Sequence, residues 1–71
     1  MPQVTIHVRG GRELASIRRL IGAVTEAVAT ALDAAPATVR VIVPEVPATH
    51  WANGDVTLAE AAHAGGSAAH E

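Results

Sequence analysis

The residues that could carry out chemistry begin at the second position of this 71-residue chain. Pro2 follows Met1, so removal of Met1 would turn Pro2 into a free secondary amine. A neutral amine can abstract a proton, and both desolvation and nearby positive charge lower the pKa of an amine. Arg9 and Arg12 flank a glycine pair in the same stretch, and a guanidinium binds a carboxylate with a planar fork of donors. The pattern indicates proton transfer on an acidic substrate.

Composition limits how such a site can be built. Hydrophobic residues make up 49% of the chain, there is no cysteine, and Trp51 is its single aromatic residue. A chain of this length forms one domain and buries only about 60% of its unfolded surface. Without disulfides to add stability, we expect this protein to oligomerise.

Charge and hydropathy exclude several classes of partner. The net charge is −2, whereas a nucleic-acid binder would present a basic face. The apolar stretches are shorter than a membrane-spanning helix, and the first residues lack the charged and apolar regions of a signal peptide. We therefore predict a cytoplasmic protein with neither a nucleic-acid nor a membrane partner.

The elements that must position the site follow from periodicity. Within residues 2–12, Val4, Ile6 and Val8 alternate with polar residues, which predicts a strand that ends at the glycine pair. The period then changes to that of an amphipathic helix, which ends before Pro36. The apolar stripe of that helix comprises Leu14, Ile17, Leu20, Ile21, Val24, Val28 and Leu32.

A second strand, rich in β-branched residues, is predicted at residues 39–43. Because Pro44 and Pro47 lack backbone donors, we expect the chain beyond this second strand to be an edge, a bulge or a loop. Strand, helix and strand form a βαβ unit with parallel strands. Residues 48–56 predict a short hairpin with its turn at Asn53-Gly54.

The expected architecture is thus α/β, with one βαβ unit and a short C-terminal hairpin. Residues 1–57 form the domain, and residues 58–71 form a partly flexible tail in which residues 58–64 make one or two helical turns. Two strands are too few for a stable sheet, so strands from other subunits are expected to complete it.

The order and spacing of Pro2, Arg12, Arg40 and Trp51 on this pattern resemble the 4-oxalocrotonate tautomerase family. The resemblance extends from Pro2 to about Gly54 and implies a homohexamer built as a trimer of dimers. It also implies that Pro2 is the catalytic base and that Arg12 binds a substrate carboxylate. By the same resemblance, Arg40 of a neighbouring subunit stabilises the dienolate, and Trp51 lines the pocket.

One position departs from the pattern of these tautomerases. Arg9 stands where they usually have an apolar residue, and together with Arg12 it resembles the α subunit of the trans-3-chloroacrylic acid dehalogenases of the same superfamily. Asn53 occupies the position of the glutamate that activates water in those enzymes, and an amide can orient water but not accept its proton. Arg9, Trp51 and Asn53 are therefore candidate substrate-binding residues beside the catalytic set.

The sequence leaves three functions open. The first is a tautomerase that shifts a proton in 2-hydroxydienoate or enolpyruvate acids without a cofactor. The second is a hydratase or dehalogenase of unsaturated acids that uses Arg9, with Pro2 as an acid. The third is a non-catalytic oligomeric subunit or binding module. A heterohexamer with a second subunit stays open beside the homohexamer. The histidines His50, His63 and His70 have no zinc-ligand spacing, so we expect no metal. His7, on the polar face of its strand, is expected to be structural and to pack at a subunit contact.

Overall fold

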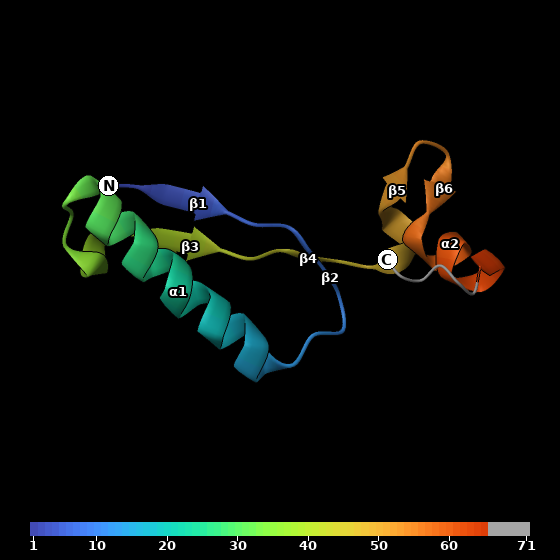
Figure 1. The fold of residues 1–71 in the computed structure, drawn as a ribbon, viewed down its shortest axis with the longest axis horizontal. Coiled ribbons are helices and arrows are strands. Elements are labelled where there is room, and N and C mark those ends of the chain that lie inside the picture. The colour runs from blue at the N-terminus through green and yellow to red at the C-terminus, as the bar shows by residue number, and fades with distance from the viewer. Residues whose placement is uncertain (66–71) are drawn as a thin grey trace. The chain divides into compact units, whose positions relative to one another are not determined.

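The fold was analysed in a computed structural model, which describes residues 1–65 (Figure 1). The predicted flexibility of the last residues, and His70, lie outside the described residues. The chain divides into two compact units, one of Met1–Val8 with Arg12–Pro44 and one of Arg9–Gly11 with Glu45–Glu71.

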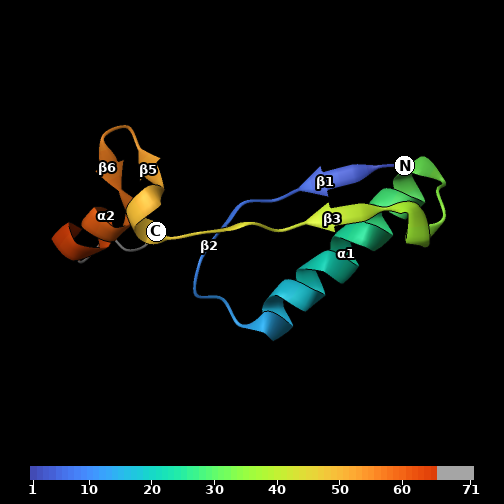
Figure 2. The same ribbon diagram turned by 180° about the vertical axis from the view of Figure 1, so that it is seen from behind.

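The first unit is the predicted βαβ motif. Strand β1 (Gln3–Thr5) pairs in parallel with β3 (Arg40–Ile42), with Val4 opposite Val41. Helix α1 (Leu14–Leu32) connects the two strands and packs against β3, as Figures 1 and 2 show from opposite sides. The α/β class and the parallel pairing are confirmed.

The strand pairing continues past β1 and β3. Beyond them, β2 (Val8–Arg9) pairs with β4 (Glu45–Val46). The N–H groups of alternate residues donate to carbonyl oxygens of the opposite segment: Ile6 to Ile42 at 2.9 Å, Val8 to Pro44 at 3.1 Å, and Gly10 to Val46 at 2.9 Å.

Pro44 lies between β3 and β4 and accounts for the interruption. A proline nitrogen has no hydrogen to donate, but the Pro44 carbonyl still accepts from Val8. The segment after Pro44 is therefore a strand of a two-stranded sheet, which agrees with the predicted edge and not with a loop. The proline costs one donor, and the pairing resumes at Glu45–Val46.

Helix α1 spans the predicted apolar stripe from Leu14 to Leu32, and the middle of that stripe is partly shielded from solvent. Ala29 is the one buried hydrophobic residue among those described, with 8% of its surface exposed. At the two ends of the stripe, Leu14 is 85% and Leu32 is 62% exposed. The helical period thus placed the stripe correctly, but the strands of a single chain cover only its central part.

The C-terminus of α1 is closed by a Schellman motif rather than by Pro36. Asp33 adopts the left-handed conformation, with φ 55° and ψ 46°. The Ala34 N–H donates to the Ala29 carbonyl at 3.0 Å, and the Asp33 N–H donates to the Thr30 carbonyl at 3.4 Å. Pro36 begins the next element, the short 3-10 helix η1 (Pro36–Thr38).

The second unit consists of short elements. The 3-10 helix η2 (Ala48–His50) leads into strand β5 (Ala52–Asn53), which pairs antiparallel with β6 (Val56–Thr57). Helix α2 (Leu58–Gly65) follows at once and packs against η2. The hairpin and the helical turns after residue 57 are confirmed.

The position of the hairpin turn differs by one residue from the prediction. Asn53 pairs with Val56, so the two turn residues are Gly54 and Asp55 rather than Asn53 and Gly54. Gly54 has φ 68°, the positive value that the first central position of a two-residue hairpin turn requires. Among the described residues, no helix is long and apolar enough to cross a membrane.

Replacing Asp33 with glycine should stabilise the protein. Glycine adopts the left-handed conformation without steric cost, and the change also removes an acidic side chain from the negative end of the α1 dipole. We expect a gain of about 1 kcal/mol, measured as a higher thermal unfolding midpoint at fixed protein concentration.

Asp33→Ala is the matched control, because it removes the charge but keeps a Cβ at the left-handed position. Its midpoint should lie below that of Asp33→Gly. A lower midpoint for Asp33→Gly than for the parent protein would contradict this account of the helix end.

Candidate active site

Pro2 lies at the start of the strand pairing in the first unit. Its carbonyl accepts a hydrogen bond from the Arg40 N–H at 2.9 Å, and its side chain is half-buried. Met1, which precedes it, is 85% exposed. The position that would bear the amine is therefore fixed by the backbone, while the residue that blocks it is open to solvent.

A backbone hydrogen bond joins Arg40 to Pro2, but the Arg40 side chain lies on the other face of the strand pair. It stands opposite Gln3 in the parallel register, and both side chains are exposed. Pro2 is half-buried, as is Val4 two residues later. Successive side chains of a strand point to opposite faces, so the Arg40 guanidinium leaves the face opposite to that of Pro2.

Arg12 lies at the other end of the first unit. The extended run from Pro2 to Val8 spans roughly 20 Å at the rise of a β-strand. Arg12 immediately precedes Glu13, the N-cap of α1, and the far end of this helix leads through η1 back to Arg40. In Figure 1 the N-terminus accordingly lies beside the last turn of α1, away from the first. A single chain does not bring Arg12 to Pro2.

The three remaining candidates belong to the second unit. Arg9 ends β2 and is exposed, and Asn53 is exposed in β5, where it pairs with Val56. Trp51 is half-buried at the end of η2, and its carbonyl accepts from the Leu58 N–H at 2.8 Å. Trp51 is thus the one candidate of this unit that is partly shielded from solvent.

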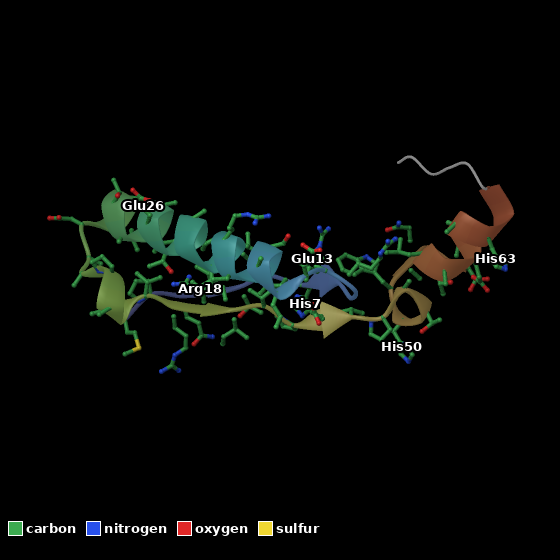
Figure 3. All side chains as sticks on the ribbon, turned by 90° about the horizontal axis from the view of Figure 1, so that it is seen from below. His7, Glu13, Arg18, Glu26, His50 and His63 are labelled. Atoms are coloured by element: carbon green, nitrogen blue, oxygen red, sulfur yellow. The ribbon has the colours of Figure 1, made fainter. Side chains whose placement is uncertain are left out.

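The described histidines lie on three separate segments of the chain. Figure 3 shows His50 on η2 and His63 on α2, and the His50 Nδ1 lies 2.7 Å from the Thr49 hydroxyl oxygen. His7 is exposed in the segment between β1 and β2. Within residues 1–65, no group of three histidine or acidic side chains could bind a metal ion.

Two residues near Trp51 were missed in the sequence. Thr57 and Glu60 bond reciprocally at the start of α2: the Glu60 N–H donates to Thr57 Oγ1, and the Thr57 N–H donates to Glu60 Oε1, both at 3.0 Å. The signal was the Thr-x-x-Glu spacing of a capping box directly before an alanine-rich helix.

Comparison with known proteins shows the family to which the chain belongs. The family model described as "Tautomerase enzyme" matches residues 2–61. The chain is 41% identical over 51 residues to a probable tautomerase of Ralstonia nicotianae, covering 72% of this chain and 73% of that protein. It is 41% identical over 54 residues to the 2-hydroxymuconate tautomerase of Stutzerimonas stutzeri, covering 76% of this chain and 86% of that protein.

A solved structure is similar over most of the chain. The heterohexamer 4-oxalocrotonate tautomerase of Chloroflexus aurantiacus superposes with a TM-score of 0.81 at 38% identity, covering 84% of this chain and 97% of that chain. The fold, the family model and the sequence relatives agree, and the chain belongs to the 4-oxalocrotonate tautomerase family of the tautomerase superfamily.

Proposed function

We propose that this protein is a cofactor-independent tautomerase of 2-hydroxydienoate or enolpyruvate acids, with Pro2 as the general base once Met1 is removed. The observation that carries the proposal is the 2.9 Å hydrogen bond from the Arg40 N–H to the Pro2 carbonyl, which fixes the amine position at the end of the strand pair. The similarity to a 2-hydroxymuconate tautomerase supports this substrate class.

The proposed reaction moves one proton. The neutral Pro2 nitrogen accepts the proton of the substrate's enol hydroxyl, which leaves a dienolate. The Pro2 ammonium then gives that proton to a carbon of the conjugated system, and the oxygen becomes a carbonyl. A guanidinium stabilises the negative charge on the enolate oxygen as it develops, and this is the role proposed for Arg40. Arg12 binds the carboxylate as a planar pair of donors.

The placement of the arginines supports a site shared between copies of the chain. The Arg40 side chain lies on the face opposite to Pro2, and Arg12 lies at the other end of the unit. Neither guanidinium is placed to meet the Pro2 amine of its own chain. We propose that each site takes Pro2 from one copy and arginines from its neighbours in a homohexamer, with Trp51 as a wall of the pocket.

The Pro2 amine is tested first. Untagged protein, with loss of Met1 confirmed by mass, should convert 2-hydroxymuconate to its keto form, followed by ultraviolet absorbance. Pro2→Ala should lower kcat/KM at least about 100-fold, because the alanine amine is free to rotate whereas the pyrrolidine ring holds the Pro2 nitrogen in one orientation. Activity of the parent protein should rise with pH as the amine loses its proton.

Protein that retains Met1, separated by mass, is the control for this experiment. Its Pro2 nitrogen is part of a peptide bond and cannot accept a proton, so it should be inactive although its fold is unchanged. Full activity in either Pro2→Ala or the Met1-retaining protein would contradict the proposed base.

Sharing of the site is tested by mixing two inactive variants. Pro2→Ala and Arg40→Ala should each lose ketonisation, while their co-refolded one-to-one mixture should regain roughly a quarter of parent activity, because random assembly pairs an intact Pro2 with an intact Arg40 in that fraction of sites. The same mixture prepared without co-refolding is the control. A co-refolded mixture as inactive as its parents would show that both residues must come from one chain.

Arg9 distinguishes the tautomerase from the hydratase alternative. It is exposed at the end of β2, and a third guanidinium would favour a second carboxylate or a keto acid. Under our proposal, Arg9→Ala should keep Pro2-dependent ketonisation, with an effect mainly on KM. The parent protein should also form no hydration product from 3-chloroacrylate. Hydration that disappears in Arg9→Ala would instead establish the second function.

A further inference from the structure

The single tryptophan is tethered to the first turn of α2. The Trp51 carbonyl accepts from the Leu58 N–H at 2.8 Å. The next residues inward, Ala52 and Thr57, stand opposite each other in the β5–β6 pair. Residues 52–57 thus form a hairpin that is closed at its base by the bond between Trp51 and Leu58. The position of the Trp51 backbone therefore depends on where α2 begins.

The start of α2 is fixed by the Thr57–Glu60 capping box. The first N–H groups of a helix have no carbonyl partner within the helix and need one elsewhere. Here the Glu60 N–H donates to Thr57 Oγ1 and the Leu58 N–H donates to the Trp51 carbonyl. The Thr57 N–H donates to Glu60 Oε1 in return. The same turn of helix thus satisfies its own donors and anchors Trp51.

Packing adds to this tether. Helix α2 packs against η2, the element that directly precedes Trp51. Leu58 and Ala59 of its first turn are half-buried, whereas Glu60 to His63 are exposed. The first turn is therefore the part of α2 that is joined to the surroundings of Trp51, and it is the part that the capping box stabilises.

We propose that Thr57 and Glu60 are positioning residues that orient Trp51 through α2. The inference rests on the proposed function, in which Trp51 is a wall of the substrate pocket. Without the capping box the first turn frays, the bond between Leu58 and Trp51 opens, and the indole takes several orientations. Substrate binding weakens, while proton transfer at Pro2, which neither residue touches, keeps its rate.

The sole tryptophan gives this proposal a direct readout. The chain has no tyrosine or phenylalanine, so its aromatic fluorescence reports Trp51 alone. Thr57→Val and Glu60→Ala each remove one side-chain acceptor. Both should shift the emission to longer wavelength and lower its anisotropy. In kinetics with 2-hydroxymuconate, both should raise KM roughly threefold or more and leave kcat within about twofold.

Control variants separate the hydrogen bonds of the capping box from the charge of Glu60 and from the overall helicity of α2. Thr57→Ser keeps the hydroxyl, and Glu60→Gln keeps the acceptor oxygen without the charge, so both should retain parent fluorescence and KM. Ala62→Gly weakens α2 beyond its first turn and should also leave Trp51 unchanged. Far-ultraviolet circular dichroism and the mass of the assembly confirm that each variant folds and associates like the parent.

Three outcomes would overturn the inference: parent-like fluorescence in Thr57→Val and Glu60→Ala, failure of Glu60→Gln to restore what Glu60→Ala loses, or altered fluorescence with an unchanged KM. Failure of the proposed function looks different, because the parent protein itself would then show no ketonisation. In that case the fluorescence of the variants still decides whether the capping box positions Trp51.

Discussion

The parallel backbone pairing of β1 with β3 is the constraint on which the first unit depends. It places Pro2 beside Arg40 through one hydrogen bond, and its alternation sends their side chains to opposite faces. Its length also separates Pro2 from Arg12, because α1 must start where the first segment ends. One backbone register therefore explains why Pro2 and Arg40 of a single chain lie on opposite faces of the strand pair, and why Arg12 lies at its far end.

The same pairing leaves the chain with little buried surface. Two strands shield the middle of the α1 stripe but not Leu14 or Leu32. A short chain cannot compensate with a larger core, so stability must come from association or from local devices. Under the proposed function, association would serve catalysis and stability together, since the neighbouring copies that cover apolar surface would also supply the arginines.

Local hydrogen bonds at the helix ends also hold the chain in place. The Schellman motif at Asp33 and the capping box of Thr57 and Glu60 each satisfy helix-end groups with neighbours in the sequence. In the second unit such a device does more than end a helix, because the helix end is bonded to Trp51. The reciprocal bonds of Thr57 and Glu60 and the bond from Leu58 to Trp51 thus involve the same first turn of α2.

The sequence by itself determined the elements and their order: the alternation of Val4, Ile6 and Val8, the bounds of α1 and the presence of the hairpin all follow from side-chain periodicity, which is a local property. The resemblance also selected the family and the candidate residues Pro2, Arg12 and Arg40. Only the tertiary structure decided which face Arg40 occupies, that pairing resumes after Pro44, and that the turn lies at Gly54 and Asp55. These depend on the backbone register between two paired segments, and periodicity within one segment contains no information about register.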